Sequence, residues 1–441
     1  MSLPSSAPPP PLTTLADGTI KQLNPFSGTE VWTVPGRGNR PLTTPSPLPR
    51  PLTAADRTAS CAFCESTPLA TPPEKARLVG GKRGWELLTD LLPGQLEESR
   101  AEFRRVPNLF EIVSYEYWSL NYGFRMDRDT RDRQARYLAD PAGRAHVADI
   151  VRTWLAASGQ DTGLPERELL ACSDRYFAGG HDVVIARRHY TDQATDTSQL
   201  ASAGTLTQEE HRGFTSFTVA AMHDLYARNR YARYVVAFQN WLAPAGASFD
   251  HLHKQLVAID EYGTQVEQEI MRLRVNPNMY NEWGVDYAHR HNLVVAANDH
   301  AVCFAGFGHR YPTLEIYSRS GSGRPWEQSP AEIADMSDLL HACHAATGAA
   351  VPCNEEWHHR PPGLDLEMPW RINLKWRVST LAGFEGSTRI YVNTLSPGNI
   401  RSRMVAALTR LRESGKISAD LRIGAECDLP PNALAYHLIT G

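Results

Sequence analysis

Alternating and helical hydrophobic patterns in the middle of the chain predict a compact unit of strands around one helix. Residues 176–189 and 234–240 are rich in β-branched and aromatic side chains, which favour strands. Between them, residues 207–228 repeat apolar positions at helical spacing and begin with the capping-box sequence Thr207-Gln-Glu-Glu210. The stretch 240–260 then predicts a glycine-bearing turn and another strand.

The remaining pattern is less regular. Residues 104–110 predict a strand that ends in a turn, and residues 130–158 predict a helix pair broken near Pro141. In the second half, the predicted strands are 294–307, 313–317 and 370–378, and the predicted helices are 330–347 and 397–412. This order resembles that of residues 176–260. An internal duplication with an α+β fold is therefore the hypothesis.

Composition narrows the classes of partner. The 441 residues carry 45 Lys and Arg against 49 Asp and Glu, a formal charge of -4, so no basic field favours duplex nucleic acid or an anionic membrane surface. No apolar run approaches the roughly 18 residues of a membrane span. Seven cysteines and no secretory leader pattern indicate a cytoplasmic protein. Residues 1–18 are proline- and serine-rich and are expected to be disordered.

The strongest chemical motif is His251-Leu-His253-Lys-Gln255, preceded by the small residues Gly246-Ala247-Ser248. On a strand, two histidines at i and i+2 point to the same face, so one can serve as a ligand while the other reacts. Small residues before them leave backbone N–H groups open to an approaching phosphate. Two structural histidines beside a turn are the alternative interpretation.

Two further motifs lie near the N-terminus. The spacing of Cys61-Ala-Phe-Cys64 lets both sulfurs reach one tetrahedral metal ion. A redox dithiol would normally stand at the start of a helix, but a turn-rich segment follows this motif. Half a zinc site is the preferred interpretation, and unpaired buried thiols are the alternative. Arg37 and Arg40 lie on a glycine-bearing loop and can clamp phosphate oxygens, or they are solvated surface arginines.

These motifs, in this order and followed by Ala382-Gly-Phe-Glu385, resemble the galactose-1-phosphate uridylyltransferase branch of the histidine triad superfamily. The resemblance implies an α+β fold of two fused histidine-triad-like units, the second degenerate, and a homodimer. After the tail, the N-terminal unit is expected over 19–260 and the C-terminal unit over 261–441.

The resemblance also implies a role for individual residues. His253 matches the nucleophile, assisted by Ser248 and Gln255. A structural zinc ion would be held by Cys61, Cys64, His189 and His251. The nucleotide and its phosphates would be bound by Arg37, Arg40, Asn108, Asn240, Gly246 and Ala247. Glu385 and Asn393 match positions that contact the sugar from the neighbouring subunit.

Departures from the family pattern matter for the substrate. Members with a second metal ion use a Glu, a lone His and a His-x-His pair. Glu269 and His358 could supply the first two, but Trp370-Arg371 stands where the pair would be. We therefore expect no second metal site. Lys254 occupies a position that is usually small or uncharged, which puts galactose phosphate in doubt as the acceptor.

The implied activity is nucleotidyl transfer by a ping-pong mechanism. His253 would attack the α-phosphorus of a nucleotide sugar, and a second phosphate, such as a sugar 1-phosphate, would then take the nucleotide from the histidine. Gln255 replaces the third histidine of hydrolytic relatives, and an amide cannot act as a general acid, which favours transfer over hydrolysis. A phosphorylase of nucleotide sugars or dinucleoside polyphosphates is one alternative. A non-catalytic nucleotide-binding protein with a structural zinc is the other.

Other histidines and cysteines receive structural interpretations. His181 is expected to pack beside its strand, and His358 and His359 are expected on a polar loop. The cysteines outside the Cys-x-x-Cys motif share no ligand spacing and are expected to be small core residues.

Overall fold

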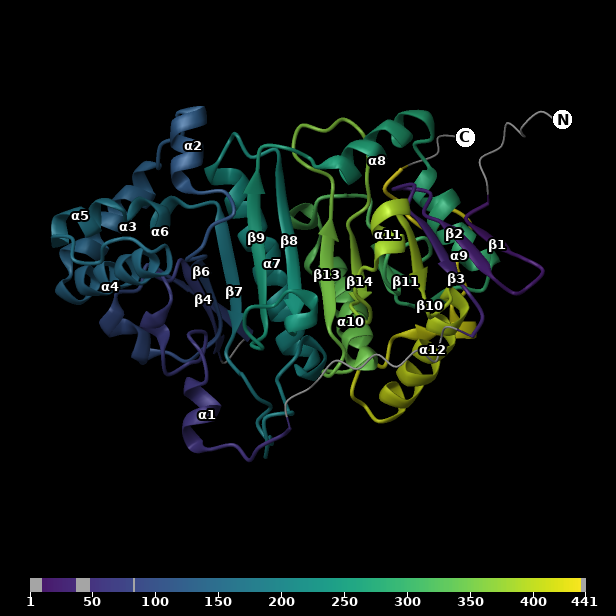
Figure 1. The fold of residues 1–441 in the computed structure, drawn as a ribbon, viewed down its shortest axis with the longest axis horizontal. Coiled ribbons are helices and arrows are strands. Elements are labelled where there is room, and N and C mark those ends of the chain that lie inside the picture. Colours follow the sequence, from purple (N-terminus) through teal and green to yellow (C-terminus); the bar gives the residue numbers. More distant parts are fainter. Residues whose placement is uncertain (1–9, 37–47, 82–83, 438–441) are drawn as a thin grey trace. The chain divides into compact units, whose positions relative to one another are not determined.

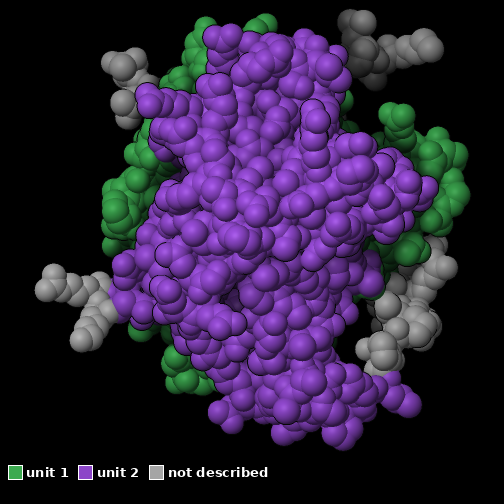
Figure 2. Space-filling model, turned by 90° about the vertical axis from the view of Figure 1, so that its left-hand side faces the viewer, with its two compact units in different colours: residues 1–47, 244–246, 262–441 green, residues 48–243, 247–261 purple. Residues whose placement is uncertain are grey.

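The computed structural model describes residues 10–36, 48–81 and 84–437. The chain forms two compact units, distinguished by colour in Figure 2. Unit 1 comprises residues 1–47, 244–246 and 262–441, and unit 2 comprises residues 48–243 and 247–261. Each contains a run of antiparallel strands (Figure 1). Arg37 and Arg40 lie outside the described residues.

Within unit 2 the strand order is β8-β9-β7-β6-β4-β5, with every neighbouring pair antiparallel. The strands are β4 (Ala76–Gly81), β5 (Gly84–Thr89), β6 (Ala101–Pro107), β7 (His181–Ala186), β8 (Tyr234–Trp241) and β9 (His253–Ile259). β7 is buried along its whole length because it lies inside the sheet between β6 and β9. The predicted metal ligand His189 follows β7, and the predicted nucleophile His253 begins β9. These two segments therefore belong to neighbouring strands.

Helix α7 (Gln208–Arg228) contacts β6, β7, β8 and β9. It begins at the predicted capping box, in which Thr207 accepts from the Glu210 N–H and Glu210 accepts from the Thr207 N–H. The remaining helices of this unit are α1 (Ala54–Ala59), α2 (Tyr115–Tyr122), α3 (Arg128–Ala139), α4 (Pro141–Ala157), α5 (Glu166–Ala171) and α6 (Asp174–Ala178). The predicted break near Pro141 is confirmed, because Asp140 caps α4 at that point.

Within unit 1 the strand order is β16-β10-β11-β12-β14-β13, again antiparallel. These strands are β10 (Val294–Ala297), β11 (Ala301–Ala305), β12 (Thr313–Ser318), β13 (Cys353–His358), β14 (Arg371–Trp376) and β16 (Arg422–Ile423). A small second sheet contains β1 (Leu12–Thr14), β2 (Ile20–Leu23), β3 (Glu30–Thr33) and β15 (Ile390–Asn393). β1 lies within the segment expected to be disordered: it pairs with β2, and its Leu12 N–H donates to the Tyr287 hydroxyl.

The helices of unit 1 are α8 (Thr264–Val275), α9 (Asp286–Arg290), α10 (Pro330–Thr347), α11 (Gly383–Thr388) and α12 (Pro397–Glu413), with a π-helical turn at Tyr280–Val285. Short 3-10 turns across the two units are Pro68–Ala70, Pro93–Glu98, Ala203–Thr205, Ala243–Ala245, Pro325–Glu327 and Gly424–Glu426. Among the described helices, none combines the length and apolar character needed to cross a membrane.

One arrangement occurs in both units. In unit 2, β7 is followed by α7 and by β8 and β9, and β9 lies between β7 and β8. In unit 1, β12 is followed by α10 and by β13 and β14, and β14 lies between β12 and β13. Strand β13 was not predicted from the sequence. Its residues Asn354, Glu355 and Glu356 form a polar run, so the hydrophobic pattern does not indicate a buried strand there.

Candidate active site and metal centre

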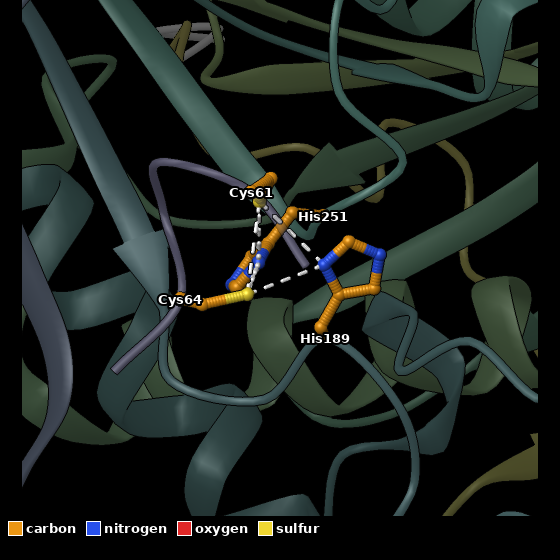
Figure 3. Close-up of side chains that lie close together, drawn as sticks. All are labelled: Cys61, Cys64, His189 and His251. Atoms are coloured by element: carbon orange, nitrogen blue, oxygen red, sulfur yellow. Dashed lines mark hydrogen bonds between the residues drawn. The ribbon is translucent and has the colours of Figure 1, made fainter. Parts of the chain in front are cut away.

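Three separate segments of unit 2 bring two cysteines and two histidines together (Figure 3). Cys61 and Cys64 follow α1, His189 follows β7, and His251 precedes β9. The two sulfurs lie 3.8 Å apart, and His189 Nδ1 lies 3.5 Å from each of them. His251 Nδ1 lies 3.5 Å from Cys61 Sγ and 3.8 Å from Cys64 Sγ.

These spacings match the edges of a tetrahedral metal site. Zinc–sulfur bonds of about 2.3 Å and zinc–nitrogen bonds of about 2.0–2.1 Å give sulfur–sulfur edges of roughly 3.8 Å and sulfur–nitrogen edges of roughly 3.6 Å. Five of the six edges of such a tetrahedron are thus matched by the four ligand atoms, which all lie within 4.8 Å of one another. The cluster confirms that the predicted residues could hold a metal ion, and its four ligand atoms leave no open position for substrate.

Hydrogen bonds around the cluster fix the direction of its ligands. His251 Nε2 lies 2.6 Å from the carbonyl oxygen of Ala186, so this nitrogen carries the proton and Nδ1 presents its lone pair to the sulfurs. Thr67 Oγ1 donates to the carbonyl oxygens of Cys61 and Cys64, which closes the turn between them. The ligand geometry is thus held by the protein fold itself.

The two thiols have unequal affinities for protons. The hydrogen bond from Cys61 lowers the pKa of Cys64 well below its ordinary value. The same shared hydrogen bond, together with burial, raises the pKa of Cys61. One sulfur is thereby prepared as a thiolate, the form that binds metal.

His253 lies immediately beyond the cluster, at the first residue of β9. Its Nδ1 lies 2.7 Å from the carbonyl oxygen of His251, which can only accept, so Nδ1 carries the proton and Nε2 keeps a free lone pair. Burial lowers the pKa of His253 to about 4, so its imidazole is neutral near pH 7. The ring of Phe63, from the cysteine turn, packs edge-on against His253 with the ring centroids 5.1 Å apart.

The expected extended conformation of both histidines is only partly present. β9 begins at His253, and His251 stands in a bend before it, because the bend carries its side chain to the cysteines and its carbonyl to His253. His251 and His253 are both buried.

Gln255 lies two residues along the same face of β9 and is part-buried. Its Oε1 lies 3.0 Å from Nε2 of His181 and 3.3 Å from Nδ2 of Asn108. Asn108 thus lies beside Gln255, at the end of β6. His181 was expected only to pack beside its strand, yet it contacts a predicted site residue. The partial signal for it was its place within residues 176–189, a strand predicted for the same unit.

The loop before His251 carries the predicted phosphate-binding residues. Gly246 adopts a φ of +87°, a left-handed conformation that glycine tolerates best, and it is exposed. Ser248 is also exposed, and Ala247 is half-buried with its N–H donating to Leu242 O at 3.3 Å. Asn240 lies within β8 and is half-buried. The role of these residues in binding phosphate stays a prediction.

Lys254 does not lie on the same face as His253. Its Nζ donates to Gln239 Oε1 at 3.3 Å and lies 4.9 Å from the ring centroid of Phe214 in α7. Successive side chains of a strand point to opposite faces, so this buried cation stabilises the α7 side of the sheet. The expectation that Lys254 signals an unusual substrate is therefore not supported.

The two residues expected to contact the sugar lie in unit 1. Glu385 accepts from the N–H groups of Ala382 and Val392, which caps α11 and ties it to β15. Asn393 is buried, and its Nδ2 donates to His309 O at 3.0 Å. Both side chains therefore have local structural bonds, and a contact with sugar stays a prediction.

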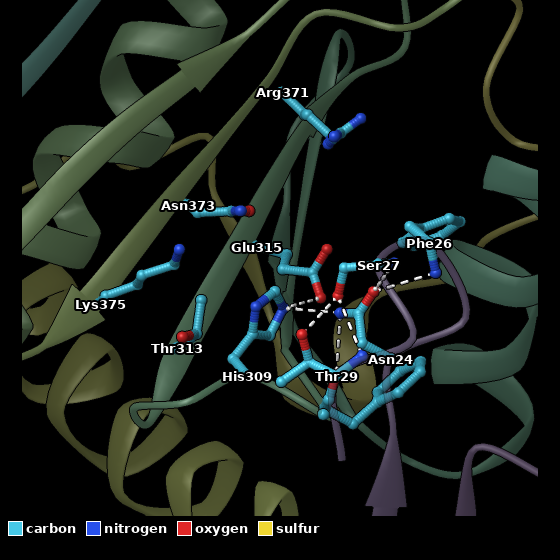
Figure 4. Close-up of polar contacts among 12 residues, drawn as sticks. Asn24, Phe26, Ser27, Thr29, His309, Thr313, Glu315, Arg371, Asn373 and Lys375 are labelled. Atoms are coloured by element: carbon cyan, nitrogen blue, oxygen red, sulfur yellow. Dashed lines mark hydrogen bonds and ion pairs between the residues drawn. The ribbon is translucent and has the colours of Figure 1, made fainter. Parts of the chain in front are cut away.

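Unit 1 carries a different set of polar residues on the strand that corresponds to β9. Arg371, Asn373 and Lys375 alternate along β14, and Figure 4 shows them on the side of the sheet that also presents Thr313 and Glu315. Near the N-terminal segment, His309 Nε2 lies 2.8 Å from Glu315 Oε1 (Figure 4). His358 ends β13 and His359 is buried, so the expected polar loop is wrong, because residues 353–358 pair with β14.

Glu269, the first residue considered for a second metal ion, is buried and paired with an arginine. Arg371 Nη2 lies 2.5 and 2.6 Å from the two carboxylate oxygens, and the Tyr280 hydroxyl donates to the same carboxylate at 2.7 Å. A guanidinium thus neutralises the carboxylate from within the fold. The absence of a second metal stays a prediction.

The family of the chain is identified by comparison with known proteins. A family profile described as "Domain of unknown function (DUF4921)" matches residues 15–436. The chain belongs to this family. Over 237 residues the DUF4921 chain is 24% identical to ADP-glucose phosphorylase of Arabidopsis thaliana, a match that covers 51% of this chain and 64% of that protein.

Solved structures show the same fold. The crystal structure of an ADP-glucose phosphorylase from Arabidopsis thaliana with bound ADP-glucose aligns with a TM-score of 0.57 at 18% identity, over 88% of this chain and 97% of that chain. A GalT-like protein of the same plant aligns with a TM-score of 0.53 at 16% identity, over 88% and 98% of the two chains. The mixed α+β fold and the resemblance to the galactose-1-phosphate uridylyltransferase branch are confirmed.

The metal cluster predicts the metal content of the DUF4921 protein. We expect about one tightly bound divalent metal ion per chain, and Cys64→Ser should remove it because a hydroxyl is a poor replacement for a thiolate. Elemental analysis of the purified protein measures this. Cys172→Ser is the matched control, since Cys172 lies outside the cluster and should leave the metal content unchanged. Equal metal in the Cys64 variant and wild type would contradict the assignment.

The buried pair of Arg371 and Glu269 predicts that removing one partner lowers stability more than removing both. Arg371→Met should lower the free energy of unfolding by about 3–5 kcal/mol, because Glu269 is left buried without its cation. Arg371→Met combined with Glu269→Met should recover much of that loss. Urea unfolding measures both.

Arg412→Met is the control, because the Arg412–Glu426 pair is partly exposed and should contribute at most about 1 kcal/mol. An Arg371 variant no less stable than this control would show that Glu269 does not depend on the guanidinium.

Proposed function

We propose that the protein is a nucleotidyltransferase that moves a nucleoside monophosphate from a sugar nucleotide to a phosphate acceptor through a covalent intermediate on His253. The observation that carries the proposal is the bond from His253 Nδ1 to the His251 carbonyl, which leaves Nε2 as a neutral nucleophile. The sequence relative named ADP-glucose phosphorylase and the structural relative holding ADP-glucose support a sugar nucleotide as the donor.

The first step forms a bond from His253 Nε2 to the α-phosphorus and breaks the bond between that phosphorus and the bridging oxygen. The electron pair leaves with the sugar phosphate, which needs no proton to depart. The substituted imidazole gains positive charge while its Nδ1 proton still bonds to the His251 carbonyl, which stabilises that charge. In the second step an acceptor phosphate oxygen attacks the α-phosphorus and releases His253.

The remaining site residues have supporting roles in this proposal. Gln255 and Ser248 would donate to the phosphate oxygens that gain charge, together with backbone N–H groups near Gly246 and Ala247. The nucleotide and its phosphates would also be contacted by Asn108, Asn240, Arg37 and Arg40. In a homodimer, Glu385 and Asn393 would reach the sugar of the partner's site through the lone pairs not used locally.

We also infer that the metal is zinc and that it is structural. Cysteine and histidine ligands in a closed tetrahedron are typical of structural zinc sites. When bound, the ion would join the turn of Cys61 and Cys64 to the strands that carry His189 and His251. The repeated order of β7-α7-β8-β9 and β12-α10-β13-β14 supports two fused histidine-triad-like units, of which the second has lost its histidine pair.

The acceptor divides the proposal into two reactions. A sugar 1-phosphate acceptor gives an exchange between nucleotide sugars, and inorganic phosphate gives a nucleoside diphosphate by phosphorolysis. The relative named ADP-glucose phosphorylase makes phosphorolysis of ADP-glucose the first reaction to test.

Intact mass measurement tests the intermediate. After incubation with ADP-, UDP-, GDP-, CDP- or dTDP-glucose, we expect one donor to add the mass of one nucleoside monophosphate to the protein. His253→Ala should abolish the adduct, and His300→Ala should not, since His300 is half-buried and pairs with Asp335 in unit 1. No adduct with any donor, or an undiminished adduct in His253→Ala, would contradict the proposal.

The washed adduct then identifies the acceptor. Inorganic phosphate should release a nucleoside diphosphate if the enzyme is a phosphorylase, and glucose 1-phosphate should release a nucleotide sugar if it is a transferase. Release of the nucleoside monophosphate in water at the same rate would instead indicate hydrolysis.

A further inference from the structure

His181 is a buried histidine that the proposed mechanism does not use. It begins β7 and is 1% exposed. Its Nδ1 lies 3.2 Å from the N–H of Ile112, and its Nε2 lies 3.0 Å from Oε1 of Gln255. Both ring nitrogens are therefore within hydrogen-bond distance of groups whose chemistry can assign the proton.

The backbone N–H of Ile112 can only donate, so Nδ1 of His181 must accept. A neutral imidazole has one N–H, which places the proton on Nε2 and directs it to Oε1 of Gln255. Burial lowers the pKa of His181 to about 4, so the ring is neutral near pH 7.

Asn108 adds a second donor to the same oxygen. Its Oδ1 accepts from the N–H of Phe110 at 2.8 Å, which turns its Nδ2 toward Gln255. Nδ2 then lies 3.3 Å from Oε1 of Gln255 and 3.1 Å from Nε2 of His181. Because both of these nitrogens carry protons, neither accepts from the other, and both donate to Oε1. Two donors thus face Oε1, and within the described part of the chain no group accepts from Nε2 of Gln255.

We propose that His181 is a positioning residue that, with Asn108, fixes the Gln255 amide so that its N–H groups face the phosphate attacked by His253. The inference rests on the proposed function for the identity of that phosphate. The two ends of an amide are nearly equal in shape, so packing alone does not choose between them. Reversal would aim an oxygen lone pair at an anionic phosphate, and the donors on Oε1 prevent that reversal.

A charge-reversing substitution tests the orientation. In Gln255→Glu, one carboxylate oxygen would accept from His181 and Asn108, and the other would face the phosphate. Formation of the nucleotidyl adduct should slow more than in Gln255→Leu, which only removes the donors, by about tenfold further. Gln255→Glu at or above the rate of Gln255→Leu would overturn the orientation.

A double-mutant cycle separates positioning from a purely structural role. His181→Leu should slow adduct formation about tenfold in the wild-type background and have little effect in the Gln255→Leu background. His181→Gln keeps a side-chain N–H donor and should restore part of the rate. An equal loss from His181→Leu in both backgrounds would overturn the proposal.

His146→Leu is the matched control for loss of a buried histidine in the same unit. His146 bonds to the Tyr137 hydroxyl at 2.7 Å and to the Thr71 carbonyl at 2.9 Å, and no contact joins it to Gln255 in the described residues. It should lower the unfolding temperature while leaving the adduct rate unchanged.

Nitrogen NMR of histidine-labelled protein makes the inference independent of turnover. With its signals assigned by comparison with His181→Leu, His181 should be neutral and protonated on Nε2 at pH 7. A proton on Nδ1, or on both nitrogens, would overturn the proposal even if the enzyme is active. An Nε2-protonated ring in a protein that forms no adduct would instead show that the proposed function, and with it a phosphate facing Gln255, is wrong.

Discussion

The meeting of Cys61, Cys64, His189 and His251 is the constraint on which the candidate site depends. The first cysteine and the last histidine are separated by 190 positions in the chain, yet their ligand atoms lie 3.5 Å apart. His251 gives its side chain to this cluster and its carbonyl oxygen to His253. One residue therefore links the candidate metal site to the tautomer of His253, and Phe63 adds a packed contact between the same two regions.

The two faces of β9 carry side chains with different roles: the proposed reactive residues lie on one face, and buried residues that stabilise the fold lie on the other. His253 and Gln255 lie on one face, and Lys254 between them lies beneath α7 with Gln239 and Phe214. On the α7 side, Asp182 of β7 also pairs with Lys75 and Arg105 within a buried charge cluster. A charge that looks adjacent to the site in the sequence is thus separated from it by the sheet, because neighbouring side chains of a strand point in opposite directions.

Local patterns predicted much of this fold, and the residues that failed explain the limits. The boundary at Pro141 and the cap at Thr207 depend on nearby atoms, so the sequence could show them. The spacing of Cys61 and Cys64 predicted half of the metal site, and the resemblance supplied His189 and His251, since no local pattern connects Cys61 with His189. β13 and the bonds of His181 depend on partners far along the chain, Arg371–Trp376 and Gln255, and hydrophobic periodicity contains no information about such pairs.

The proton of His181 also bears on the choice between transfer and hydrolysis. A histidine close to the reacting phosphate could in principle protonate a leaving group, yet here the Nε2 proton is held by Oε1 of Gln255 and the ring stays neutral. In the proposed mechanism, the group that faces the phosphate is then an amide N–H, which donates a hydrogen bond and does not release a proton. Such a site assists leaving groups that depart as anions, and phosphates are leaving groups of that kind.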